Sequence, residues 1–122
     1  YEAEASGNTI AGGASVVSCG GCSGGAKIGN VGGSGYVIIN NVNAATAGTY
    51  LMQLSYVDGD SSRTAIVTVN GKSFEQPLPG TNDNNWDSAQ TITIAVPLNA
   101  GANTVQFGNP TDYVSDIDKI TV

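Results

Sequence analysis

Three acidic residues and a tyrosine gather in the last fifteen residues of the chain, which run from a Gly-Asn-Pro turn into an alternating strand. They are Asp112, Tyr113, Asp116 and Asp118. Carboxylates are hard oxygen ligands for a cation, and a tyrosine in a polar loop presents an aromatic face to a ligand. We expect one end of this stretch to hold a cation and the other end to contact a ligand.

Two glutamates near the start of the chain supply further oxygen ligands. Glu2 and Glu4 alternate, so in a first strand their side chains share a face, as those of Asp118 and Ile120 do in a last strand over 116–122. If these two strands are neighbours, three carboxylates meet at one edge, and their repulsion raises their pKa values unless a cation neutralises them. Oxygen ligands without histidine or cysteine favour calcium over a transition metal. The alternative is three separate solvated acids at strand ends.

The composition excludes several classes of function. The 122 residues contain no histidine, which excludes a Ser-His-Asp triad, a Cys-His pair and a histidine-ligated zinc. The net charge is −6 with only four basic residues, whereas a nucleic-acid partner requires clustered lysine and arginine. No apolar run approaches the roughly 20 residues of a membrane span. We therefore expect neither a nucleic-acid nor a membrane partner.

The only cysteines, Cys19 and Cys22, lie in a glycine-rich segment. Their spacing also occurs in thioredoxin-like redox pairs, but that motif opens a helix in a βαβ unit, and the surrounding glycines disfavour a helix. A structural disulfide that shapes a loop is the favoured interpretation. A disulfide indicates a secreted, extracellular protein. A chain that begins Tyr-Glu-Ala-Glu is interpreted as a processed or excised fragment.

Short alternating apolar segments between turn residues predict an all-β domain without helices. Residues 6–35 are rich in glycine, serine and asparagine and predict long loops with one or two short strands. Asn70-Gly71 predicts a tight hairpin, because both residues accept positive φ. Eight or so strands at regular spacing predict one domain over 1–122, a jelly-roll β-sandwich of two antiparallel sheets. The expected strands are 1–5, 36–42, 49–57, 64–69, 72–76, 91–96, 104–107 and 116–122.

Several short motifs along the whole chain resemble one known family. They are Tyr1-Glu2-Ala3-Glu4, Ser34-Gly35-Tyr36-Val37, Ala47-Gly48-Thr49-Tyr50 with Leu54-Ser55-Tyr56, Val69-Asn70-Gly71, Leu98-Asn99-Ala100-Gly101-Ala102-Asn103-Thr104-Val105 and Asp116-Ile117-Asp118-Lys119-Ile120-Thr121-Val122. Each is short, but in this order they resemble the carbohydrate-binding modules of family 35, which are close to family 6. The cysteine loop and the Gly-Asn-Pro-Thr-Asp-Tyr segment resemble modules attached to fungal galactan-degrading enzymes.

The resemblance implies a jelly-roll sandwich with a structural calcium ion (Ca2+) held by Glu2, Glu4 and Asp118. It also implies sugar binding in the loops at one end of the sandwich. There an aromatic ring covers the C–H face of a pyranose and a few fixed polar groups bind its hydroxyls. The candidate sugar contacts by position are Tyr36, Asp58, Trp86, Asn109, Tyr113 and Asp116.

Most of these candidates also have a structural interpretation. Tyr36 is equally consistent with a half-buried strand residue, and Trp86 with an anchor for its own loop rather than a sugar platform. Asp58 and Asp60 are typical turn formers whose carboxylates cap their own loop. Tyr113, flanked by acids in a loop, is the least like a core residue.

The assignment of Asp116 to sugar and Asp118 to calcium depends on the backbone between them. The two residues share the alternation parity of a regular strand, so a flat strand would place them on one face. The division therefore requires the loop to bend before Ile117.

The expected function is a non-catalytic, monomeric module that holds a covalently linked glycoside hydrolase near its polysaccharide. The acidic rim and the lack of a basic side chain in a matching loop position favour a neutral galactose-type glycan, such as β-1,3-galactan. The alternatives are uronic-acid or mannan-type glycans, and a calcium-stabilised adhesive sandwich without a sugar ligand. A small glycosidase using Asp112 and Asp116 is disfavoured, because short loops on 122 residues rarely build a deep, desolvated cleft.

Overall fold

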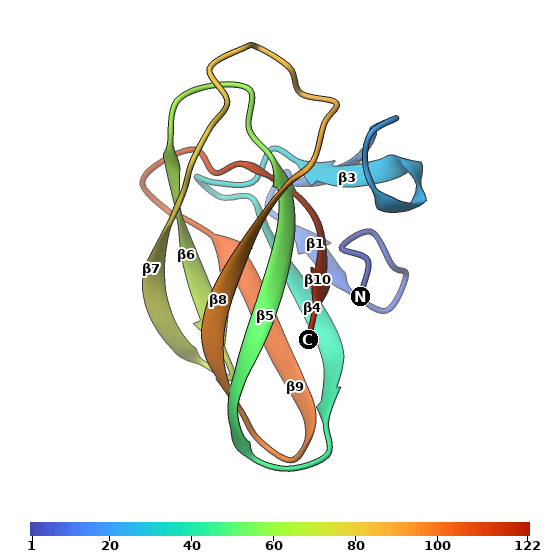
Figure 1. Ribbon diagram of the computed structural model, residues 1–122, viewed down its shortest axis with the longest axis vertical. Coiled ribbons are helices and arrows are strands. Elements are labelled where there is room, and N and C mark those ends of the chain that lie inside the picture. Colours follow the sequence, from blue (N-terminus) through green and yellow to red (C-terminus); the bar gives the residue numbers. More distant parts are fainter.

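A computed structural model describes residues 1–122 as ten β-strands with one 3-10 turn, η1 (Ser23–Gly25), and confirms the predicted all-β class. The strands pair antiparallel into two five-stranded sheets, which lie face to face as the predicted jelly-roll sandwich (Figure 1). The strand bounds are β1 (Thr9–Ala11), β2 (Ser15–Ser18), β3 (Ala26–Gly29), β4 (Tyr36–Ala44), β5 (Gly48–Val57), β6 (Arg63–Val69), β7 (Lys72–Leu78), β8 (Gln90–Leu98), β9 (Gly101–Gly108) and β10 (Asp116–Thr121).

One sheet, which we call the β5 sheet, has the strand order β2-β3-β10-β5-β8, and the other, the β9 sheet, has the order β1-β4-β9-β6-β7. No helix is long and apolar enough to cross a membrane.

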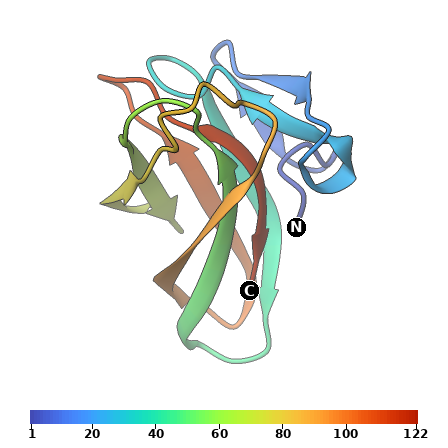
Figure 2. The same cartoon turned by 45° about the horizontal axis from the view of Figure 1, so that its top comes forward.

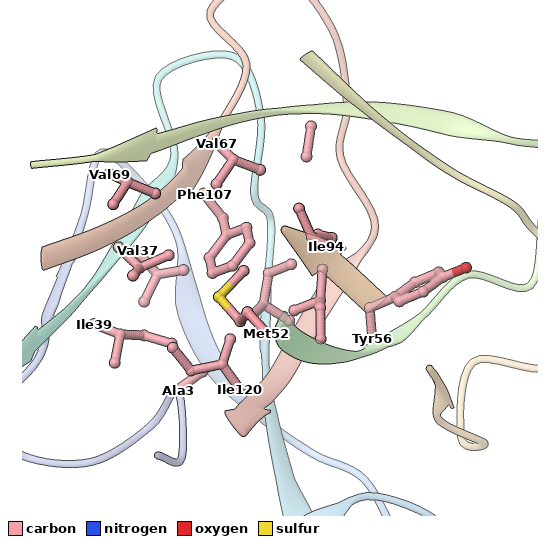
Figure 3. Packing of buried hydrophobic residues seen from close by; sticks show 14 of the residues in the cluster. Ala3, Val37, Ile39, Met52, Tyr56, Val67, Val69, Ile94, Phe107 and Ile120 are labelled. Atoms are coloured by element: carbon pink, nitrogen blue, oxygen red, sulfur yellow. The ribbon is translucent and has the colours of Figure 1, made fainter. Parts of the chain in front are cut away.

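The core lies between the sheets and follows the alternation of the long strands. On β8, Ile94 and Val96 are buried while Thr91 and Thr93 are exposed, as predicted. Apolar side chains from both sheets form one cluster of 22 buried residues, several of which point into the shared interior in Figure 3. Each large apolar side chain buried there contributes about 1.5–3 kcal/mol relative to exposure. This rigid sandwich positions the loops that carry the site.

The first five residues do not form the predicted strand. Only an isolated bridge joins Glu2 to Lys119, and the amide of Ala3 donates to the carbonyl of Asp118 at 2.9 Å. The chain then turns at once, since the amide of Ala5 donates to the carbonyl of Glu2. The N-terminal segment nevertheless lies beside β10, as the cation-site prediction requires.

Residues 6–35 contain three short strands, β1, β2 and β3, rather than one or two. β2 is an edge strand in which all four residues are exposed, so it has no alternation for a sequence pattern to reveal. In β3 the polar Lys27 is buried because it is ion-paired with Asp116 at 2.9 Å. Short strands of this kind cannot be predicted from hydrophobic periodicity, because their residues are exposed or are buried through an ion pair.

The hairpin between β6 and β7 forms as predicted, with Asn70 at φ 49° and Gly71 at φ 84°. The return strand, however, continues through Pro77 to Leu78 instead of ending at residue 76. β7 is an edge strand, so the missing N–H of a proline leaves no neighbouring strand unpaired.

A bulge in β10 changes which side chains share a face. The register against β5 shifts between Ile117 and Lys119, which makes Asp118 the extra residue. As a result Ile117 and Ile120 are both buried in the core, while Asp118 accepts a hydrogen bond from Ser55 on the outer face of the β5 sheet. The prediction that Asp118 and Ile120 share a face is therefore wrong, and the irregularity comes after Ile117, not before it.

Candidate functional site

Three carboxylates meet on the outer face of the β5 sheet, under the loop of residues 19–25. Asp118 Oδ2 accepts hydrogen bonds from the hydroxyl of Ser55 at 2.8 Å and from the amide of Ser23 at 3.2 Å. The hydroxyl of Ser23 also contacts Oε1 of Glu2. Gly24 lies over Glu4, since a Cβ on this glycine would be 3.0 Å from Oε1 of Glu4. The structure thus brings together the three predicted metal ligands, which we call the carboxylate cluster.

The carboxylate cluster contains buried oxygens that no hydrogen-bond donor contacts. One oxygen of each acid is buried without a hydrogen-bond partner, namely Oε2 of Glu2, Oε2 of Glu4 and Oδ1 of Asp118. Burial is the largest cause that raises the pKa of Glu4 above 4.5; a backbone hydrogen bond lowers it in part, and the nearby charges of Glu2 and Asp118 raise it again. Unpaired buried carboxylate oxygens are costly to the fold.

These oxygen donors are of the type that calcium prefers. In this structure the side chains of the three acids are not arranged as they would be around a metal ion. Calcium takes about 6–8 oxygens and also accepts carbonyls, hydroxyls and waters. The hydroxyl of Ser23, which contacts Glu2, is a further oxygen at this place.

Cys19 and Cys22 are joined by a disulfide, as predicted. The bond closes a turn in which the amide of Cys22 donates to the carbonyl of Cys19 and the amide of Gly25 to that of Cys22. No βαβ unit surrounds the pair, so the structural interpretation holds. The same loop contacts the loop of Trp86, because Gly21 bridges to Ser88. The disulfide therefore shapes a loop that covers the carboxylate cluster.

Four loops gather at the end of the sandwich that comes forward in Figure 2. We call this the loop end. Two of its loops, 30–35 and 108–115, are joined by backbone hydrogen bonds from Gly33 to Asn109 at 2.8 Å and from Val114 to Val31 at 2.9 Å. A Cβ on Gly32 would be 2.3 Å from the carbonyl oxygen of Asp112, so only glycine allows this approach. The other two loops are 58–62 and 79–89.

Tyr113 lies at the tip of these joined loops with 74% of its surface exposed. It borders two shallow hollows of about 200 and 310 Å³, which we call the Tyr113 hollows. The first is lined by Gly12, Gly13, Asn30, Gly32, Ser34 and Tyr113, and the second by Gly33, Pro110, Thr111, Asp112 and Tyr113. An exposed aromatic ring beside polar groups on a rigid backbone is the arrangement that binds a pyranose.

Arg63 lies between the two aromatic side chains of the loop end. Its guanidinium carbon is 4.9 Å from the ring centre of Trp86 and 5.9 Å from that of Tyr113, and its Nη1 donates to the carbonyl of Val114 at 3.3 Å. These distances are in the range of cation–π contacts. A basic side chain thus reaches the loop end from the start of β6, although no basic residue stands in a matching loop position of the sequence. Nothing in the sequence around Arg63 indicates this position, which depends on how three loops converge.

Trp86 is half-buried and serves to anchor its loop. Lys27 Nζ lies 5.8 Å from the centre of its ring, and the same ammonium group donates to the backbone carbonyl of Trp86. Asp116 in turn is ion-paired with Lys27, which leaves its side chain 16% exposed. The predicted sugar contacts Trp86 and Asp116 thus share one lysine, which binds the backbone carbonyl of Trp86 and one carboxylate oxygen of Asp116.

Asp58 and Asn109 are structural rather than free polar groups. Asp58 is fully buried, and its carboxylate accepts from the amide of Asp60 at 2.9 Å and the hydroxyl of Ser115 at 3.0 Å. This corrects its prediction as a sugar contact and supports the turn-former interpretation. The amide of Asn109 donates to the carbonyl of Thr64 and accepts from the backbone of its own turn. Asn109 therefore borders the loop end with its amide oxygen and one of its two N–H groups already engaged.

Tyr36 lies on the outer face of the β9 sheet, at its border with the loop end. It lines a hollow of about 200 Å³, which we call the Tyr36 hollow. The hollow is lined by Gly33, Gly35, Tyr36, Ile66, Thr68, Gln106, Gly108, Asn109 and Pro110. Ile66, Thr68 and Gln106 were missed from the sequence, because outward strand residues of mixed polarity resemble any solvated face.

Comparison with known proteins identifies the family. The sequence profile of carbohydrate binding module family 35 matches residues 1–122. The chain belongs to this family. A family 35 carbohydrate binding module from Clostridium thermocellum is 35% identical, with a TM-score of 0.94 over 99% of this chain and 95% of that one. The predicted resemblance and fold are thus confirmed.

Two further relatives are much longer than this chain. An exo-beta-1,3-galactanase from Phanerochaete chrysosporium, solved with beta-1,3-galactotriose, is 32% identical, with a TM-score of 0.89 over 98% of this chain and 28% of that one. A 1,6-alpha-glucosyltransferase from Sporosarcina globispora is 43% identical over 72 residues, which cover 55% of this chain and 5% of the enzyme. Family 35 modules therefore occur as parts of carbohydrate-active enzymes with different activities.

Proposed function

We propose that residues 1–122 form a non-catalytic module that holds a covalently linked glycoside hydrolase on its polysaccharide, by binding galactose-type glycans at the Tyr113 hollows. The observation that carries the proposal is the 74% exposed ring of Tyr113, fixed beside two hollows by paired backbones. Exposing so large an apolar face costs free energy unless a ligand covers it. The apolar C–H face of a pyranose is such a ligand.

A β-1,3-galactan is the first ligand we propose. The loop end carries the exposed carboxylates of Asp112 and Asp60, of which Asp60 is ion-paired with Arg63 at 3.5 Å, and carboxylates accept strong hydrogen bonds from neutral sugar hydroxyls. The similarity to an exo-beta-1,3-galactanase over 98% of this chain supports the same choice. Glycans that carry uronic acids are the second candidate, because Arg63 lies 5.9 Å from the ring of Tyr113 and could pair with a carboxylate.

The acids at the loop end support binding rather than hydrolysis. A glycosidase needs two carboxyl groups facing one another across the scissile bond, one of them in a desolvated cleft. Asp112 is exposed, Asp116 is ion-paired with Lys27, and the hollows are shallow. Together with the disulfide, which favours an extracellular setting, this supports an ancillary role in a secreted enzyme.

We also propose that the carboxylate cluster holds a structural calcium ion. Glu2, Glu4 and Asp118 would supply ligands, and the three unpartnered buried oxygens support this assignment. The positive charge would offset the repulsion among the acids and fasten both the N-terminal segment and the 19–25 loop to the β5 sheet. The ion has no chemical step in sugar binding.

The proposed function is tested by titration calorimetry of the isolated module with β-1,3-galactotriose, an aldouronic xylo-oligosaccharide and mannotriose. We expect heat of binding with galactotriose and little with mannotriose. Binding of the aldouronic sugar alone would replace galactan by the uronic-acid candidate. Silence with all three sugars would favour an adhesive sandwich without a sugar ligand.

A further inference from the structure

The outer face of the β9 sheet has a notch where three strands run side by side. Gly108 pairs with Ile66, and a Cβ on this glycine would be 3.2 Å from Cβ of Tyr36. The missing side chain therefore leaves a gap between the ring of Tyr36 and the side chain of Ile66. This gap is the centre of the Tyr36 hollow.

The walls and floor of the Tyr36 hollow combine an aromatic ring with free hydrogen-bonding groups. Tyr36 and Ile66 form apolar walls, while Gln106 and Thr68 lie together in the next row of the sheet. The amide of Gln106 makes no side-chain hydrogen bond within the protein, so two donors and one acceptor remain available. Its volume of about 200 Å³ is below the roughly 300–1,000 Å³ of drug-sized sites. It suits one sugar ring in shallow contact.

The Tyr36 hollow adjoins the larger of the two Tyr113 hollows. Gly33 and Pro110 line both the Tyr36 hollow and the larger Tyr113 hollow. Gly33 raises no wall between them, because even a Cβ at this position would meet nothing within 4 Å. The two tyrosine rings therefore border neighbouring hollows that meet at the Gly33–Pro110 rim.

We infer that the Tyr36 hollow is a second sugar subsite, which binds a further residue of a glycan chain whose first residue occupies a Tyr113 hollow. The module then recognises a stretch of several linked sugars in preference to a single terminal one. This inference rests on the proposed sugar-binding function and adds to it the length and the path of the ligand. Two linked contacts gain affinity because the second is made without a new loss of translational freedom.

The test is calorimetric titration of the wild-type module with galactose and with β-1,3-linked galactobiose, galactotriose and galactotetraose. We expect the association constant to rise at least tenfold between galactose and the longer oligomers. In Gln106→Ala the ratio of the oligomer and monosaccharide constants falls towards one, because the floor of the Tyr36 hollow loses its free amide. Thr104→Ala, an exposed outward residue of the same strand outside the hollow, is the matched control and keeps the wild-type ratio.

Chemical-shift mapping with galactotetraose provides a second readout that does not depend on a variant. We expect shifts at Gln106 and Thr68 in addition to those around Tyr113. Binding of all four sugars with equal affinity, or shifts confined to the loops of Tyr113, would overturn the second subsite and leave the proposed function intact. Absence of binding to every sugar would overturn the proposed function itself.

Discussion

Glu4 is a residue whose negative charge is unfavourable in the folded protein when no cation is bound. Its pKa is raised first by burial and then by the charges of Glu2 and Asp118, and its Oε2 has no partner. A raised pKa means that the folded state binds the proton more tightly than the unfolded state. The protonated form is therefore the one that favours folding when no cation is bound.

The raised pKa of Glu4 predicts how the free energy of unfolding depends on pH. In EDTA, the contribution of Glu4 is fully present below its unfolded pKa of about 4.5 and is lost as pH rises through the raised folded pKa. With calcium the carboxylate form is stabilised, so the gain in unfolding free energy on adding calcium increases with pH across this window. Urea unfolding at several pH values from 4.5 upwards, with and without calcium, measures it. A calcium effect that does not vary with pH would contradict this assignment.

The variant Glu4→Gln separates the repulsion that the Glu4 charge causes without calcium from the attraction that it exerts on a calcium ion. In EDTA the variant should be at least as stable as wild type, because it removes repulsion, whereas the stabilisation by calcium should fall by about 1 kcal/mol or more. Thermal melts with and without calcium give both values. Glu75→Gln, at an exposed position on β7, is the control and should change neither. Loss of stability in EDTA with an unchanged calcium effect would exclude Glu4 as a ligand.

At the scale of elements, the parts predicted from the sequence are those whose pattern is local. The long strands β5 and β8, the Asn70-Gly71 hairpin and the Cys19–Cys22 pairing could be predicted, because alternation, turn residues and cysteine context each have one physical reading. The short strands of residues 6–35 and the bulge at Asp118 could not, because they depend on partners far along the chain. The position of Arg63 between Trp86 and Tyr113 could not be predicted either, because both partners lie far along the chain.

The disulfide loop should act mainly through the carboxylate cluster. The loop closed by Cys19 and Cys22 is short, so in EDTA the double variant Cys19→Ser/Cys22→Ser should lose only about 2 kcal/mol of unfolding free energy. In calcium the loss should be larger, because Ser23 then no longer holds its position against Glu2 and Asp118. Denaturant unfolding under both conditions tests this. An equal loss with and without calcium would show that the loop does not support the ion.

At the scale of the whole molecule, the cluster and the sugar hollows occupy separate places on one rigid sandwich. The cluster lies under the 19–25 loop, whereas the hollows lie around 30–36 and 108–113, and they share no lining residue. The core between the two sheets connects them. Stability and ligand binding should therefore separate experimentally.

Chelation provides that separation. An ion at about 100 times its Kd contributes roughly 2.7 kcal/mol, which for a domain of this size corresponds to a melting temperature lower by roughly 10 °C in EDTA. Well below the melting temperature, the affinity for β-1,3-galactotriose should change less than about twofold. Calorimetry and thermal melts on the same samples measure both. An unchanged melting temperature would count against the calcium ion, and complete loss of sugar binding would count against separate sites.

The measurement that tests the central claim most directly is titration of Tyr113→Ala with β-1,3-galactotriose beside wild type. Tyr113 is the exposed ring of the loop end, and its removal should weaken binding about tenfold or more, or ~1.4 kcal/mol, with an unchanged melting temperature. Leu51→Ala, which removes another apolar side chain that is 71% exposed, should bind as wild type does. Equal affinities of Tyr113→Ala and wild type would contradict a sugar site at the loop end.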